Sequence, residues 1–498
     1  MRSRHHSATE ADAATNRSSL YSFERRRFLT GSAGLCGLAA MRALLSQEGV
    51  LGAEPGALPG APAGSGLPAP HFPPRAKNCI FLFLAGGTSQ IELFDPKPKL
   101  ETLAGSRVPM SLLRSVSPVL QKKWRNRPIM ASRFGYRRYG KCGTEMSELL
   151  PRIGACADDI ALVRSMYHHT VDHAQGELFL ATGRDQPGRP SGGAWLSYGL
   201  GSPARDLPSY VVLLNGRGPL SRELVWGNGA LPSQHRGVLL RSQGEPILNL
   251  EDPAGLPVAV KQRRLDAIIG LNRRQFEKTL DPEIEARIAS YELAFRMQTA
   301  APELVDLSRE PRRLRESYGV ERSGQAGVFS RNCLLARRMV ERGVRFVTLF
   351  QAKWDHHKEL DAGLSSQCRE VDQPIGALLE DLKARGMLDS TLVVWATEFG
   401  RTPITDGADS PGPKAGRGHH PFAFSMWMAG GGVRGGQVIG STDELSWHAA
   451  EDKVHVHDFN ATLLHLFGLD HSRLTYRSGG ADVRLTNQEG EVVERLLV

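Results

Sequence analysis

Long apolar runs recur along this chain and limit its possible folds more than any other feature. They lie at 78–87, 159–166, 209–216, 344–351, 390–400 and 421–431. A continuous apolar run bounded by glycine or polar residues is typical of a strand buried on both faces, as in a parallel sheet. Helical segments separate several of the runs. The alternation predicts right-handed crossovers and therefore an α/β fold, with a doubly wound, mostly parallel sheet and helices on both faces.

Two segments lack the alternation of strands and helices, and they indicate where the domain begins and where it carries an insertion. Residues 54–75 are rich in Pro, Gly and Ala and cannot form a core, so we interpret them as a linker. Residues 258–322 are charged and rich in Arg, with a helical period. We expect one α/β domain over 76–498 that carries a helical insertion at about 258–322.

The first 53 residues contain the pattern of an exported precursor. Arg25 and Arg26 begin the stretch RRRFL, and a short apolar run follows. This pattern resembles a twin-arginine signal. The apolar run has about eleven residues, whereas a membrane span needs about 20. We predict that Arg25 and Arg26 direct export by the twin-arginine machinery, that the mature protein is periplasmic or otherwise exported, and that it has no stable membrane span.

The net charge of the chain is +9, and part of it lies in the first 53 residues. The rest is spread along the sequence without a block of Lys and Arg. Proteins that bind nucleic acid cluster their basic residues in a patch or stripe. We therefore predict a mildly basic solvated surface and no nucleic-acid partner.

Polar residues that suit a metal or anion site stand near the ends of several predicted strands. Chemistry in such sheets gathers at the carboxyl ends of the strands. Carboxylate oxygens and imidazole nitrogens are ligands for divalent ions. Taken singly, each residue also fits a hydrogen-bonded loop, and Glu398 with Arg401 fits a salt bridge. The residues at these strand ends are Glu92, Asp355, His356, His357, Glu398, Arg401, His419 and His420.

A resemblance to a known family follows from motifs in a fixed order. The motifs are GGTSQIELFDPKP, WDHH, TEFGRTP, GRGHHPFAFSMWMAGGGVRGG and VHVHDFNATLLHLFGLDH. In this order they resemble the family known as domain of unknown function 1501 (DUF1501), within the alkaline phosphatase and sulfatase superfamily. The resemblance runs from about residue 76 to 485 and implies an alkaline phosphatase-like fold.

The resemblance implies one metal site with three ligands. Asp355, His357 and His420 fit the positions that hold one metal in the superfamily. It favours His357 over His356, whereas the choice of His420 over His419 stays open. The metal itself would be a divalent ion such as Zn, Ca, Mg or Mn.

A second metal of the superfamily is less well supported by the sequence. Ala85 stands where the first ligand is usually Asp, and Glu92 or Asp95 could replace it only if the loop folds back. Glu398 fits the later Asp position, but Phe399 replaces the His that usually follows.

The stretch HHTVDHAQGELFLATGR, residues 168–184, resembles the nucleophile segment of phosphatases and sulfatases. Counting nine residues back from Thr182 reaches His173, where these enzymes have Ser, Thr or Cys. An imidazole there could bind a metal, transfer protons, act as a nucleophile or simply form a hydrogen bond. We favour a metal ligand or a general acid/base.

Two functions follow from these observations. The first is an exported metal-dependent hydrolase that acts on a phosphate or sulfate ester of a small molecule or glycan. In it, Glu398 or His173 would complete the metal shell or activate a water, and Arg401 would bind an anionic oxygen. The alternative is a non-catalytic envelope protein that keeps the fold and binds a ligand. The changes at Ala85, His173 and Phe399 favour this alternative.

Overall fold

The computed structural model describes residues 67–242, 247 and 257–498, and its central element is a nine-stranded sheet. The strands follow the order β12-β4-β11-β8-β1-β7-β5-β6, and β15 also pairs with β4. All pairings in this sheet are parallel except those that β11 makes with β4 and β8. The strands are β1 (Asn78–Leu84), β4 (Ile160–Tyr167), β5 (Tyr210–Asn215), β6 (Val238–Leu240), β7 (Phe346–Gln351), β8 (Thr391–Ala396), β11 (Phe424–Ala429), β12 (Gln437–Ile439) and β15 (Val454–His455).

Each of the apolar runs forms a strand of this sheet, which confirms the predicted α/β fold with a mostly parallel sheet. The exception is the direction of β11. A parallel connection needs a crossover, usually a helix. Between β8 and β11 the chain instead forms an antiparallel hairpin of β9 (Gly400–Asp406) and β10 (Gly416–His420), and β11 returns in the opposite direction.

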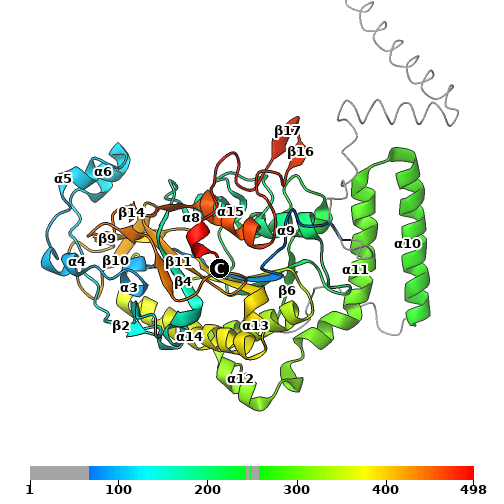
Figure 1. Cartoon of the computed structure of the whole chain (residues 1–498), viewed down its shortest axis with the longest axis horizontal. Coiled ribbons are helices and arrows are strands. Elements are labelled where there is room, and N and C mark those ends of the chain that lie inside the picture. The colour runs from blue at the N-terminus through cyan, green and yellow to red at the C-terminus, as the bar shows by residue number, and fades with distance from the viewer. Residues whose placement is uncertain (1–66, 243–246, 248–256) are drawn as a thin grey trace, which may run out of the picture. The chain divides into compact units, whose positions relative to one another are not determined.

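Helices cover both faces of the sheet (Figure 1). Side chains of β1 alternate between two cores: Ile80 and Leu82 join one, whereas Phe81 and Phe83 join the other. Full burial of such side chains contributes about 1.5–3 kcal/mol each. The first core includes residues of α7 (Pro151–Ala155), α13 (Gly324–Glu341) and α14 (Leu360–Ala384). The second includes residues of α8 (His173–Thr182), α9 (Gly192–Leu200) and α15 (Val456–Leu466).

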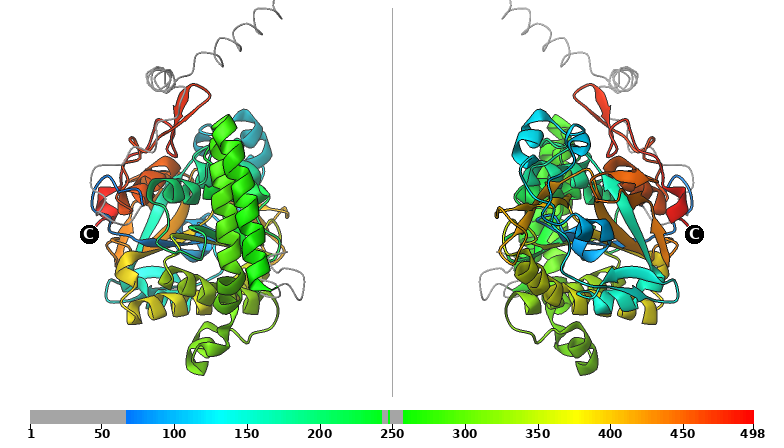
Figure 2. Two further views of the ribbon diagram at one scale, coloured as in Figure 1. Left: turned by 90° about the vertical axis from the view of Figure 1, so that its right-hand side faces the viewer. Right: turned by 90° about the vertical axis from the view of Figure 1, so that its left-hand side faces the viewer.

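The region predicted as an insertion is helical. α10 (Val258–Thr279) and α11 (Pro282–Val305) lie side by side as a hairpin, and α12 (Arg312–Tyr318) follows (Figure 2). Asp281 caps α11 because its carboxylate accepts a hydrogen bond from the main chain of Glu283. The end of α11 joins the first core through Leu304.

Two sequence predictions concern the amino-terminal region. Arg25 and Arg26, with the rest of the predicted signal, lie outside the described residues, as does most of the predicted linker. In the part of the chain that the structure describes, no helix has the length and apolar character needed to cross a membrane.

Candidate metal centre

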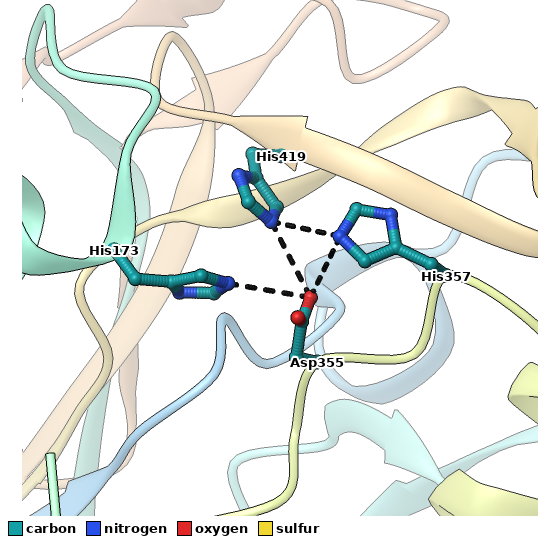
Figure 3. A group of neighbouring side chains, drawn as sticks. All are labelled: His173, Asp355, His357 and His419. Atoms are coloured by element: carbon teal, nitrogen blue, oxygen red, sulfur yellow. Dashed lines mark hydrogen bonds and ion pairs between the residues drawn. The ribbon is translucent and has the colours of Figure 1, made fainter. Parts of the chain in front are cut away.

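Three histidines and one aspartate meet at one edge of the sheet (Figure 3). One possible ligand atom from each of His173, Asp355, His357 and His419 lies within 4.8 Å of the others. His173 opens α8 after β4, and the Asp355–His357 loop follows β7. These two parallel strands end at the same edge. His419 lies on β10, which leads into β11, and β11 starts at that edge because it runs antiparallel.

The Oδ1 atom of Asp355 is the shared neighbour of the three imidazoles. It lies 2.9 Å from His357 Nε2 and 3.3 Å from the Nε2 atoms of both His173 and His419. The Nε2 atoms of His357 and His419 are themselves 2.9 Å apart. Two imidazole lone pairs at that separation repel each other unless a cation lies between them, so the geometry calls for a proton or a metal ion.

The other nitrogen of each ring is held by a group that accepts a hydrogen bond. The Nδ1 contacts are Glu398 Oε1 for His173 (2.7 Å), Asp406 Oδ2 for His357 (2.9 Å) and the Val171 main-chain oxygen for His419 (2.7 Å). With a hydrogen on Nδ1, a neutral ring presents its lone pair at Nε2. Metal-ligating histidines are held in this way by carboxylates and carbonyls.

A buried polar atom in the group has no hydrogen-bond partner. His173 Nε2 is enclosed, and its contact with Asp355 lacks hydrogen-bond geometry. An unsatisfied buried polar group costs about 1–3 kcal/mol. A divalent ion held by the four residues would satisfy this atom, so the side chains present fit a metal site.

Burial and neighbouring charges shift the pKa values of these side chains in opposite directions. Burial lowers the pKa of His173, but Asp355 and Glu398 outweigh it and raise that pKa to about 9. Burial raises the pKa of Asp355, yet its histidine neighbours bring it well below the usual range. Burial lowers the pKa of His419. Protons therefore compete with a metal ion for these ligand atoms.

Glu398, predicted as a metal ligand, contacts His173 from behind and is not one of the four clustered residues. The carboxylate is fully buried, and its Oε1 accepts hydrogen bonds from His173 Nδ1 and, at 2.8 Å, from the Gly86 main chain. Gly86 has φ +121°, and a Cβ there would lie 2.6 Å from the nitrogen of Asp355. Only glycine lets the loop after β1 approach this closely. Glu398 therefore orients His173.

Arg401 also differs from both sequence interpretations. Its side chain is fully buried and pairs with Asp355 at 2.6 Å, not with Glu398. Its other nitrogens donate to main-chain oxygens, including those of Gly87 (2.8 Å) and Arg417 (3.1 Å). No exposed N–H is left for a substrate oxygen. Arg401 instead fixes Asp355 against the loop after β1.

Of the two adjacent histidines, His419 lies in the group and His420 does not. Neighbouring residues of a strand point to opposite faces. His420 points into the protein, where its Nε2 donates to the Trp447 main-chain oxygen at 2.7 Å and its ring packs near Trp124. Burial lowers the pKa of His420 to about 4. His357, preferred over His356 from the sequence, does lie in the group.

The carboxylates that the sequence offered for a second metal form ion pairs with basic side chains instead. Glu92 forms a buried ion pair with Arg417 at 2.6 Å, and Asp95 pairs with Lys97 at 2.9 Å. Phe399 stacks on the His419 ring with a centroid distance of 4.7 Å. Its apolar ring packs against the His419 imidazole, at a position where the sequence resemblance implied a histidine.

The fold and these side chains define an α/β protein with a candidate metal centre at the carboxyl edge of its sheet. Residues 76–497 match the model of the family described as "Protein of unknown function (DUF1501)", and the chain belongs to that family. The resemblance seen in the sequence motifs is thereby confirmed. A comparison with curated protein sequences gives no match.

Solved structures that match this chain in fold include a synthase, a phosphatase and a sulfatase. A lipoteichoic acid synthase from Listeria monocytogenes is 8% identical, with a TM-score of 0.37 over 82% of this chain and 75% of that one. An alkaline phosphatase from the Antarctic bacterium TAB5 is 9% identical, with a TM-score of 0.33 over 79% and 98%. A sulfatase from Pseudoalteromonas sp. is 14% identical, with a TM-score of 0.31 over 79% and 68%.

Proposed function

We propose that this chain is an exported, metal-dependent hydrolase that acts on a phosphate or sulfate ester. The observation that carries the proposal is the convergence of three Nε2 atoms on Asp355, with each opposite Nδ1 held by an acceptor. A divalent ion in such a set supplies a Lewis acid and lowers the pKa of a bound water towards neutrality. The substrate class follows from the resemblance of the motifs to phosphatases and sulfatases.

The ligand set favours some ions over others. His173, His357 and His419 offer three imidazole nitrogens, and Asp355 offers one carboxylate oxygen. Ca and Mg prefer sites made of oxygen atoms, whereas imidazole suits Zn and other transition metals. We therefore expect Zn rather than Ca, Mg or Mn.

The chain's own residues argue for water as the nucleophile. Both ring nitrogens of His173 face other groups, Glu398 and Asp355, so this imidazole is not available for attack on a substrate. The side chain of Asp355 is 42% exposed and that of His357 is 34% exposed. Solvent and a substrate can therefore reach the group from this side, while Glu398 and Arg401 hold its inner side rigid.

The test is metal content together with hydrolysis by the purified mature protein. Zn²⁺, Mn²⁺, Mg²⁺ and Ca²⁺ would be loaded singly, and nitrophenyl phosphates, phosphodiesters and sulfates would serve as substrates. We expect Zn²⁺ to support hydrolysis that a chelator removes. Asp355→Asn should lose both metal and hydrolysis, whereas Asp389→Asn, in the turn before β8, should keep both.

A second candidate is a non-catalytic ligand-binding protein, and specific observations favour it. The nucleophile slot holds His173, Phe399 packs against His419, and the buried Arg401 offers nothing to an anion. A metal-loaded protein that hydrolyses none of these esters, yet binds one of them or inorganic phosphate, would replace the hydrolase proposal with this one.

A further inference from the structure

A separate cluster of two histidines and a glutamate lies where β15 leads into α15. One possible ligand atom from each of His455, His457 and Glu489 lies within 4.8 Å of the others. None of the three belongs to the candidate metal centre. We propose that these residues form a second metal site, for a divalent ion of the zinc type, which fastens the carboxyl-terminal segment to the domain.

The two nitrogens of His457 have different partners. Its Nε2 lies 2.9 Å from the main-chain oxygen of Gly183, and its Nδ1 lies 2.9 Å from Oε2 of Glu489. A carbonyl oxygen only accepts, so Nε2 carries a hydrogen and a neutral ring presents its lone pair at Nδ1. That lone pair faces a carboxylate oxygen, and two acceptors this close need a shared cation. An imidazole whose other nitrogen donates to a main-chain carbonyl is a typical metal ligand.

His455 supplies the third ligand atom at the first turn of the helix. Its Nδ1 accepts a long hydrogen bond of 3.3 Å from the His457 main chain, so an ion bound at Nδ1 would replace this helix-capping bond. The positive end of the helix dipole opposes a cation here. Two carboxylates offset that effect: Glu489 and Asp458, whose Oδ2 accepts from the His455 main chain at 2.8 Å.

Packing holds the imidazoles in place before any ion arrives. The ring of Phe179 lies 5.1 Å from the ring of His457 and 5.7 Å from that of His455, measured between centroids. The side chain of His457 is only 5% exposed, whereas that of Glu489 is 64% exposed. An ion can thus enter from solvent on the Glu489 side. Two imidazoles and one carboxylate leave open positions for water, and this ligand set suits Zn²⁺ better than Ca²⁺.

The site would connect three parts of the fold. Gly183 ends α8, the two histidines begin α15, and Glu489 lies in the segment that follows β17 (Ala481–Val483). An ion that binds only the native state stabilises it by mass action. Zinc should therefore raise the melting temperature through this cluster, independently of any catalysis at the first centre.

The experiment titrates Zn²⁺ into the purified protein in a His419→Ala background, which weakens the first centre. Glu489→Gln removes the exposed carboxylate, and His455→Asn removes the imidazole while keeping a good helix cap. Glu491→Gln, an exposed neighbour of the same type outside the cluster, is the matched control. Calorimetry gives the zinc affinity, and thermal unfolding gives the change in melting temperature.

We expect Glu489→Gln and His455→Asn each to weaken zinc binding by at least about tenfold and to reduce the zinc-dependent rise in melting temperature. Glu491→Gln should behave like the His419→Ala parent. If Glu489→Gln binds zinc as tightly as the parent, the cluster is a protonated His457–Glu489 ion pair and the proposal is wrong. Because Glu489 is exposed, this variant decides the question even if His455→Asn folds poorly.

Discussion

The Nδ1 atom of His173 lies 2.7 Å from Oε1 of Glu398, a carboxylate with no exposed surface. This contact fixes the imidazole ring with its Nε2 towards Asp355. The position that resembles a nucleophile slot therefore holds an oriented imidazole. A hydroxyl there would be free to attack a substrate, whereas this ring is held at Nδ1 by Glu398 and its enclosed Nε2 faces Asp355. The chemistry of the site thus depends on what the Nε2 atoms bind.

Replacing Glu398 tests this orientation. In Glu398→Gln the amide oxygen can still accept the hydrogen bonds of His173 and Gly86, but the negative charge is lost. We expect metal affinity at the centre to fall by about 10- to 100-fold, with little loss of folded structure. Metal titration followed by calorimetry gives the affinity. Glu380→Gln, on the exposed side of α14, is the control and should leave the affinity unchanged.

Replacing the two adjacent histidines should give opposite results. His419→Ala removes a ligand atom and should reduce metal affinity at the first centre by more than about tenfold. His420→Ala should leave the ligands in place but lower the free energy of unfolding by about 2–4 kcal/mol, because it removes a buried ring and its hydrogen bond to Trp447. Metal binding and denaturant unfolding of both variants would distinguish them. Equal loss of metal in both would contradict the assignment of His419.

The sequence predicted the main sheet well because each central strand is buried on both faces. The run at 78–87 contains apolar residues for two cores at once, and no amphipathic helix has that pattern. The reversal of β11 was not predicted. It depends on the hairpin of β9 and β10, whose strands are polar and carry buried charges such as Arg417. Apolar periodicity gives no signal for such strands.

The sequence predicted the site residues that follow apolar strands better than those on the polar hairpin. Asp355, His357 and His173 stand near the ends of strong strands, so topology alone brings them together. His419 and His420 are neighbours on β10. Their roles differ because His419 faces the group and His420 faces the protein interior. Asp406 was missed because it lies 49 positions from its partner His357 on a hairpin that the sequence did not reveal.

Export is tested with the precursor. We predict that changing Arg25 and Arg26 together to Lys leaves the unprocessed chain in the cytoplasm, because the twin-arginine machinery reads the paired arginines and not charge alone. Fractionation and immunoblotting of cells that express each form would show this. Lys substitutions at Arg2 and Arg4, which lie outside the RRRFL stretch, are the control. Normal export of the Arg25 and Arg26 variant would contradict the predicted signal.

The stability of the protein without bound metal should depend on pH. The carboxylates of Asp355 and Glu398 outweigh burial and raise the pKa of His173 from 6.5 to about 9. A histidine with a raised pKa contributes stability that is fully present below pH 6.5 and is lost as pH rises through about 9. A shift of this size corresponds to roughly 3 kcal/mol. Denaturant unfolding in the presence of a chelator should therefore give a lower free energy at pH 9.5 than at pH 6.5, and His173→Asn should lose that difference.

Metal binding should depend on pH in the opposite sense, because the ion must displace the proton from His173. For one proton released, affinity should rise by about tenfold per pH unit from pH 6.5 and level off near pH 9, where the ring is already neutral. Calorimetric titrations across this range would measure the slope. The Glu398→Gln variant loses one of the charges that raise this pKa, so its affinity should level off at a lower pH. A wild-type affinity that is independent of pH between these limits would show that His173 does not exchange its proton for the ion.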